Sequence, residues 1–141
     1  MEIAYLQTPI GFAEFQGDEN GLASVSVFDD KKPIGIIPDV LEDAIYQFKE
    51  YFEGSRKEFD LKLNPSGTDF QKKVWDALLE IPFGKTISAV ASANGKNPLW
   101  IVVPCHRVIG TNGDLTGYAG GLHRKKWLLE HESPAKQTTL F

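Results

Sequence analysis

Residues 104–108 read Pro-Cys-His-Arg-Val and directly follow the apolar run Leu99-Trp100-Ile101-Val102-Val103. Cys105 is the only cysteine of the chain, and His106 is its neighbour. A thiol attacks carbon as the thiolate, which forms only with the help of a base or a positive field. The pair therefore indicates a reactive nucleophile. A lone cysteine is also often a small buried side chain, and on the pentapeptide alone this alternative stays open.

Further motifs flank this stretch on both sides. They are Asn97-Pro98, the loop Gly117-Tyr118-Ala119-Gly120-Gly121-Leu122, and the segment Lys126-Trp127-Leu128-Leu129-Glu130-His131-Glu132. Together with residues 104–110 they resemble the O6-alkylguanine-DNA alkyltransferase family, whose members move an alkyl group from O6 of guanine onto their own cysteine. The resemblance extends more loosely from residue 1 to residue 133. A related alkyltransferase-like group has tryptophan at the nucleophile position, whereas Cys105 keeps transfer chemically possible here.

The catalytic residues expected from this resemblance are Cys105, His106 and Glu132. His106 is the candidate base, but neighbours in a regular strand point to opposite faces, so a tight turn or a bridging water is needed. The resemblance implies the water, and it implies that Glu132 orients His106. Read without the family, Glu132 is a solvated residue at a helix end. Arg107 is either functional or a structural ion-pair partner, and its spacing does not decide which.

The substrate-binding residues expected from the resemblance are Asn97, Val108, Tyr118 and Ala119. Asn97 braces the loop that presents Cys105, and the backbone carbonyl of Val108 reads the guanine amino group. Tyr118 lines one wall of the alkylguanine pocket, and the Ala119 backbone N–H bonds O6 of guanine. Many family members have serine at the position of Ala119, so only the main-chain contact is carried over. Without the family, glycine-rich loops of this kind are ordinary turns.

The composition is that of a globular protein, with 141 residues and 42% hydrophobic side chains. No stretch approaches the length of a membrane span, and no secretion signal begins the chain, so we expect a cytoplasmic protein, nucleoid-associated if bacterial. One cysteine forms no internal disulfide, and three scattered histidines give no zinc spacing. We expect neither a metal nor a cofactor.

Charge is distributed unequally along the chain. Residues 1–65 carry a net charge of −7 and residues 66–141 a net charge of +3. Phosphate contacts depend on local positive charge, so this asymmetry permits DNA binding by the half that contains Cys105. The candidate cations are Lys72, Lys73, Lys85, Lys96, Arg107, Arg124, Lys125 and Lys126.

The expected fold class is α+β, with a small N-terminal domain over residues 1–65. Short strands are predicted over residues 3–7, 12–16 and 22–28, and they form an antiparallel sheet. Asp39 followed by Glu42 predicts the N-cap of a helix that ends at Gly54 and covers one face. The residues expected to pack against the sheet are Leu41, Ala44, Ile45, Phe48 and Phe52.

The breaker cluster at residues 64–67 predicts a boundary to a C-terminal domain over residues 66–133. Thr68 and Gln71 form a second capping box, which starts a helix packed on that domain. Its expected apolar stripe consists of Phe70, Val74, Ala77, Leu78 and Ile81. Another helix is predicted from Leu122 to about His131, and residues 134–141 form a flexible tail. The resemblance implies a mainly helical, winged-helix-like catalytic domain.

The helix-turn-helix of this domain is incomplete in the sequence. The family places two helices, a tyrosine and a nucleotide-replacing arginine after the position of Ser88, but this chain continues directly with Ala89-Val90-Ala91-Ser92-Ala93-Asn94. About fifteen residues are missing relative to a two-helix unit. Either the segment is deleted, or it is a mobile region left out of a sequence that is not contiguous here. We expect the second, and a Cα–Cα distance from Ser88 to Ala89 far above about 3.8 Å would demonstrate it.

These observations predict a monomeric, single-turnover DNA-repair protein that transfers an alkyl group from O6-alkylguanine in double-stranded DNA to Cys105. One alternative is a sensor that binds alkylguanine without transfer, and another is an engineered self-labelling variant. The tail ends Gln137-Thr138-Thr139-Leu140-Phe141. It looks like the Gln-x-x-Leu-Phe peptide with which bacterial DNA proteins bind the sliding clamp, through Gln137, Leu140 and Phe141. The other reading is an unstructured terminus.

Overall fold

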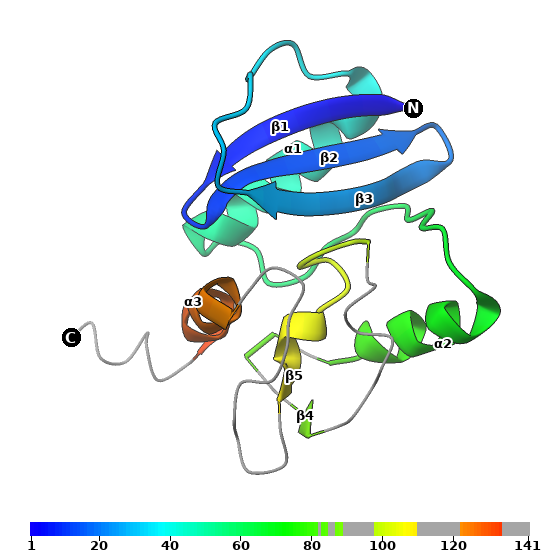
Figure 1. The fold of residues 1–141 in the computed structure, drawn as a ribbon, viewed down its shortest axis with the longest axis vertical. Helices are drawn as coiled ribbons and strands as arrows, with labels where there is room; N and C mark the ends of the chain where they lie inside the picture. Colours follow the sequence, from blue (N-terminus) through cyan, green and yellow to red (C-terminus); the bar gives the residue numbers. More distant parts are fainter. Residues whose placement is uncertain (82, 85–86, 89–97, 110–121, 134–141) are drawn as a thin grey trace. The chain divides into compact units, whose positions relative to one another are not determined.

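A computed structural model describes residues 1–81, 83–84, 87–88, 98–109 and 122–133 of the chain (Figure 1). The Cα–Cα distance from Ser88 to Ala89, on which the expected omission after Ser88 depends, involves Ala89, which lies outside the described residues. The omitted segment therefore stays a prediction. None of the described helices is long and apolar enough to cross a membrane.

The chain divides into two compact units. The first contains Met1–Ser66 together with the short segment Pro98–Trp100, and the second contains Gly67–Asn97 and Ile101–Phe141. The sequence indicated a change of unit near residues 64–67. It did not indicate that Pro98–Trp100 packs with the first unit.

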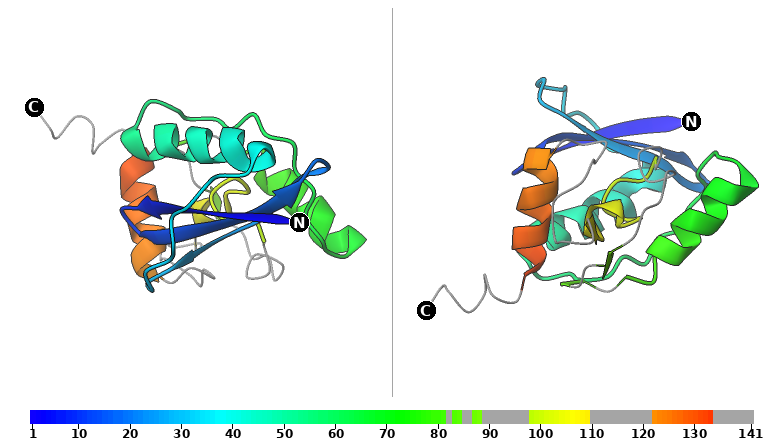
Figure 2. Two further views of the ribbon diagram at one scale, coloured as in Figure 1. Left: turned by 90° about the horizontal axis from the view of Figure 1, so that it is seen from above. Right: turned by 60° about the horizontal axis from the view of Figure 1, so that its bottom comes forward.

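The first unit is built on a three-stranded antiparallel sheet of β1 (Glu2–Thr8), β2 (Gly11–Asp18) and β3 (Gly21–Phe28). Tight hairpins join the strands, with Thr8 opposite Gly11 and Asp18 opposite Gly21. Helix α1 (Asp39–Glu53) runs along one face of this sheet (Figures 1 and 2). The predicted α+β class, the three strands and the covering helix are confirmed.

The core of the first unit lies between the sheet and α1. Side chains alternate along β2, so that Ala13 and Phe15 are buried while their neighbours are half-buried. Phe15 meets Phe48 of α1 edge to face, with ring centroids 4.7 Å apart, which is a favourable arrangement for two aromatic rings. Leu41, Ala44, Ile45 and Phe48 are buried as predicted, whereas Phe52 is only half-buried.

The C-terminal end of α1 was predicted correctly, but its N-terminal cap was not. Pro38 occupies the N-cap and no side chain caps the helix, so the predicted Asp39 cap is wrong. Asp39 and Glu42 lie in the first turn instead, where a negative charge interacts favourably with the helix dipole. Gly54 ends the helix in the left-handed conformation with φ of 90°, which glycine adopts without a steric penalty.

The segment after α1 is held to the first unit by backbone hydrogen bonds and by one buried side chain. Leu22 of β3 donates to the carbonyl of Lys62 and accepts from the N–H of Asn64, both at 2.8 Å. The side chain of Gln47, which is buried in α1, accepts from the N–H of Asp60 at 2.8 Å and donates to the Asp60 carbonyl at 2.9 Å. Gln47 therefore binds the segment after α1 as a neighbouring strand would.

The second unit begins with helix α2 (Asp69–Leu78). The predicted capping box is confirmed: Thr68 accepts from the Gln71 N–H at 3.1 Å, and Gln71 accepts from the Thr68 N–H at 2.9 Å. The other described elements are β4 (Ile87–Ser88) parallel to β5 (Val108–Ile109), the 3-10 turn η2 (Cys105–Arg107), and α3 (Leu122–Glu132). The predicted helix at residue 122 is therefore present.

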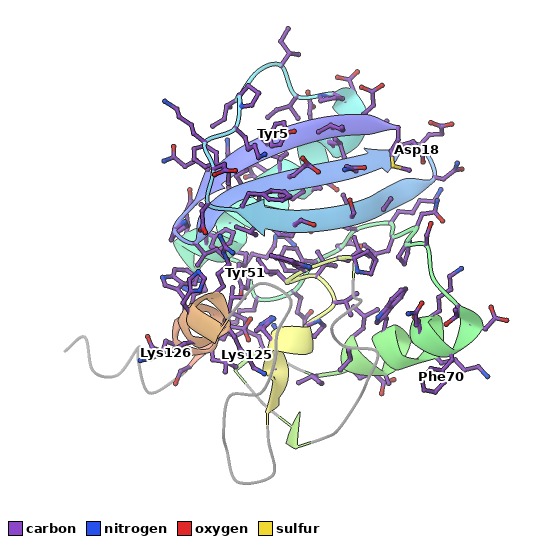
Figure 3. The ribbon with its side chains drawn as sticks, in the orientation of Figure 1. Tyr5, Asp18, Tyr51, Phe70, Lys125 and Lys126 are labelled. Atoms are coloured by element: carbon purple, nitrogen blue, oxygen red, sulfur yellow. The ribbon has the colours of Figure 1, made fainter. Side chains whose placement is uncertain are left out.

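The buried stripe of α2 is rotated relative to the prediction. Trp75 and Leu78 are buried, whereas Phe70 is 65% exposed and projects away from the helix (Figure 3). Ala77 is exposed as well, and Ile81, beyond the end of the helix, is buried. The predicted burial of Phe70 and Ala77 is wrong because helical spacing alone does not select which of two neighbouring stripes packs inward.

Substituting Gln47→Ala should lower the free energy of unfolding by about 1–3 kcal/mol, because it leaves the N–H and carbonyl of Asp60 without their partner. Urea unfolding followed by circular dichroism measures this loss. Gln7→Ala on the exposed side of β1 is the matched control and should change stability by less than about 0.5 kcal/mol. Equal effects of the two substitutions would contradict the role assigned to Gln47.

Candidate active site

The turn η2 and the end of helix α3 form the candidate site. Cys105 begins η2 and is followed by His106 and Arg107, while Glu132 is the last residue of α3. The backbone here is a tight 3-10 turn and not a regular strand, so the rule that neighbouring side chains point to opposite faces does not apply. The side chain of Cys105 lies outside the described part of the structure.

His106, Arg107 and Glu132 form one buried cluster. The Nε2 atom of His106 lies 2.8 Å from Oε2 of Glu132. Arg107 donates to the same carboxylate twice, from Nε to Oε1 at 2.7 Å and from Nη2 to Oε2 at 3.0 Å. Its Nη1 also donates to the backbone carbonyl of Ile81. The reading of Glu132 as a solvated residue is wrong, because only 2% of its surface is exposed.

The charges in this cluster follow from burial and from Arg107. Burial alone would raise the pKa of Glu132, but hydrogen bonds from His106 and Arg107, together with the positive charge of Arg107, outweigh burial and lower the pKa to about 2. Burial lowers the pKa of His106, and this effect exceeds the opposing attraction of Glu132. At neutral pH the cluster therefore contains the ion pair of Arg107 and Glu132 beside a neutral imidazole.

This charge state fixes the tautomer of His106. A carboxylate ionised at neutral pH only accepts hydrogen bonds, so the proton of the neutral imidazole is on Nε2, facing Glu132. The lone pair is then on Nδ1, which is buried too. A neutral imidazole with an oriented Nδ1 lone pair is a proton acceptor, and the nucleophile candidate is the preceding residue. The arrangement is chemically suited to general-base activation of a thiol.

The predicted substrate-binding residues are described only in part. Val108 is the first residue of β5, and its side chain lies outside the described part. Asn97, Tyr118 and Ala119 also lie outside the described residues. Within the described ranges no group of three or more His, Cys, Asp or Glu side chains could hold a metal ion.

The sequence left the part of Arg107 in the site open between a functional role and a structural ion pair. Its fork onto Glu132 and its bond to the carbonyl of Ile81 join three stretches of chain within the second unit. The spacing of residues 107 and 132 carries no signal for this pairing. The one sequence feature that points to Arg107 is its position next to His106, the candidate base. That feature does not decide between a functional role and an ion pair.

Several predicted DNA-facing cations are buried. Arg107, Arg124 and Lys125 are each less than 8% exposed, so they are not available as surface cations, and for Arg107 the ion-pair alternative is confirmed. Lys72, Lys73 and Lys126 are exposed. Figure 3 labels Lys125 and Lys126, which follow one another on α3. Lys85 and Lys96 lie outside the described residues. The surface cations of the described part are thus fewer than the sequence suggested.

Two family models match most of the chain. Residues 1–65 match the ribonuclease-like domain of 6-O-methylguanine DNA methyltransferase, and residues 87–134 match the DNA-binding domain of the same protein. The chain belongs to this methyltransferase family. The family assignment made from the motifs around Cys105 is therefore confirmed.

Curated relatives carry the name methylated-DNA--protein-cysteine methyltransferase. The protein of Methanosarcina acetivorans is 44% identical, and the alignment covers 94% of this chain and 98% of the relative. The protein of Mycobacterium tuberculosis is 49% identical over 67% of each chain. Other members of the methyltransferase family thus resemble both halves of this chain.

Solved structures of the family have the same fold. The Mycobacterium tuberculosis OGT protein in complex with DNA superposes with a TM-score of 0.83 at 39% identity, covering all of both chains. A methyltransferase from Pyrococcus kodakaraensis, at 18% identity and a TM-score of 0.54, shares the fold alone.

Folding stability should fall as the pH drops below 6.5. The unfolded chain protonates His106 there while the folded chain holds it neutral, so the loss is at most about 1.4 kcal/mol per pH unit. The contribution of Glu132 to folding stability is complete above pH 4.5, the pKa of this carboxyl in the unfolded chain. It is lost as the pH falls from 4.5 towards 2, the pKa in the folded chain. Urea unfolding at pH 5.0 to 7.5 measures the change in folding stability with pH that is due to His106.

His106→Gln, whose amide can still donate to Glu132, should flatten this slope. The matched control is His123→Gln on the exposed surface of α3, which should leave it unchanged. An unaltered slope in the His106 variant would show that the imidazole is not held neutral.

Proposed function

We propose that this chain repairs DNA by direct transfer of an alkyl group from O6-alkylguanine to Sγ of Cys105. The observation that supports the proposal is the buried cluster of His106, Arg107 and Glu132 directly after the nucleophile candidate. In this single displacement the S–C bond forms as the C–O6 bond breaks, and guanine leaves with the electron pair. The thioether has no route back to thiol, so each molecule reacts once.

His106 acts as the general base in this mechanism. Its Nδ1 accepts the thiol proton, through a bridging water as the family resemblance implies, and the proton then serves to neutralise the leaving guanine. Glu132 accepts the Nε2 hydrogen and stabilises the imidazolium while it exists. Arg107 keeps Glu132 ionised, so the carboxylate orients the imidazole and does not compete for its proton.

The substrate pocket is assigned by resemblance to four further residues. Asn97 braces the Cys105 loop, and the Val108 carbonyl accepts from the guanine amino group. Tyr118 forms one wall, and the Ala119 N–H donates to O6. A base in duplex DNA hides O6 in the stack, so the alkylated nucleotide must be flipped into this pocket.

The macromolecular partner is alkylated double-stranded DNA. The DNA complex of the Mycobacterium tuberculosis relative and the match to a DNA-binding domain support this partner. The net charge of +3 over residues 66–141 is consistent with phosphate contacts by the second unit. We assign the protein to the cytoplasm, on the nucleoid if it is bacterial, and expect it to act as a monomer.

Incubation with O6-benzylguanine should transfer one benzyl group to Cys105 and release guanine. Mass spectrometry of the intact protein and its peptides measures the adduct, and Cys105→Ser should show no mass gain. Measurable binding of the base with an unchanged mass would contradict transfer and support the sensor alternative instead.

The shortened segment after Ser88 should reduce reaction with DNA more than reaction with the free base. Seven residues from Ser88 to Asn94 make at most about two helical turns, which is too few for a helix-turn-helix. We therefore expect the second-order rate constant for an O6-methylguanine duplex to be at least about tenfold below that of a full-length relative, with O6-benzylguanine reacting comparably. Single-turnover assays of both proteins measure the ratio, and equal rates on the duplex would contradict this account.

We also propose that the C-terminal peptide with Gln137, Leu140 and Phe141 binds a sliding clamp. The support is the spacing of its two apolar anchors, and these residues lie outside the described part of the structure. Leu140→Ala combined with Phe141→Ala should abolish binding to the purified clamp in surface plasmon resonance. The control is Thr138→Ala combined with Thr139→Ala, and clamp binding by the Leu140 and Phe141 variant would remove the proposal.

A further inference from the structure

The segment before the nucleophile is fixed to the edge of strand β3. Val25 donates its N–H to the carbonyl of Pro98 at 2.8 Å, and Trp100 donates to the carbonyl of Val25 at 3.2 Å. Leu99 forms a parallel bridge with Val25 and is completely buried. These bonds set the direction of the backbone as far as Trp100, five residues before Cys105.

The next residue, Ile101, has a strained backbone. Its φ of 75° is positive, and among the described residues it is the single non-glycine residue with such a value. A β-branched side chain is especially unfavourable there, because Cβ and its two branches crowd the backbone. Strain of this kind persists only where the surroundings hold it, and it is concentrated at functional sites.

Burial of the Ile101 side chain offsets the energetic cost of the strained backbone. Ile101 is 1% exposed, and the two residues that follow it, Val102 and Val103, are also buried. A glycine would adopt the same φ without a penalty, but it would lose this burial and leave the turn free to move. Isoleucine at a glycine-like position therefore produces a rigid turn.

The turn lies between two fixed stretches of chain. On its C-terminal side Arg107 donates its N–H to the carbonyl of Pro104 at 3.0 Å, and its side chain is held by Glu132 and Ile81. Four residues, 101–104, connect the sheet-paired segment to η2. Ile101 is thus the first of the four residues that lead into the turn that contains Cys105.

We propose that Ile101 is a positioning residue for the reaction of Cys105. Its strained left-handed turn orients the backbone that carries the nucleophile towards the proton relay. The inference rests on the proposed alkyl transfer and adds a residue that does not itself touch the reacting atoms.

The test compares Ile101→Gly with Ile101→Ala. In a normal backbone alanine is more stable than glycine, but at positive φ the order reverses, so the glycine variant should have the higher urea midpoint. The same variant should nevertheless react more slowly with O6-benzylguanine, with a maximal rate constant about tenfold below that of the alanine variant and an unchanged half-saturating concentration. A merely structural role would make the rate follow the stability.

Two controls separate this inference from folding defects and from the proposed function. Ile101→Val keeps a β-branched side chain and should retain the wild-type rate constant. Val27→Ala and Val27→Gly, at a buried position of β3, should show the normal stability order and equal rate constants. An alanine variant at position 101 that is more stable than the glycine variant, or equal rate constants for the two, would overturn the inference. Failure of the wild-type protein to form an adduct would instead refute the transfer reaction.

Discussion

The buried ion pair of Arg107 and Glu132 is the interaction on which the site depends. It places a permanent cation against a carboxylate that also contacts His106, all within the second unit. Removing one partner of such a pair leaves an uncompensated charge, at a cost of about 3–5 kcal/mol. The pair therefore does two things at once: it joins η2 to α3, and it determines which of the two titratable groups carries the charge.

The stretch of chain before the nucleophile is held within the first unit. The sheet of the first unit provides an edge to which Pro98–Trp100 is hydrogen-bonded, and the following turn at Ile101 carries the strain. The family models and the curated relatives are named as methyltransferases of methylated DNA, and a solved structure of OGT in complex with DNA has the same fold. The segment after Ser88 is shorter than the two-helix unit that the family resemblance predicts, while the relay residues are present.

Local signals predicted most of the fold. The three strands, α1 and the Thr68 capping box depend on alternation, helical spacing and residues within one turn, all of which are readable in a short window. The predictions that were wrong depend on distant neighbours: the exposure of Phe70 and the burial of Lys125. In the site, family motifs pointed to His106 and Glu132, but the choice of Arg107 as the ion-pair partner of Glu132 is a tertiary contact without a sequence signal.

The central claim is that Cys105 is activated by proton transfer to a neutral His106, and the pH dependence of its alkylation tests this most directly. Rate constants with O6-benzylguanine should be measured from pH 6.5 to 8.5 for the wild-type protein and His106→Gln. The wild-type rate should stay nearly level, whereas the variant should gain about tenfold per pH unit until the thiol ionises unaided near pH 8.5. Two profiles of the same shape would contradict the account.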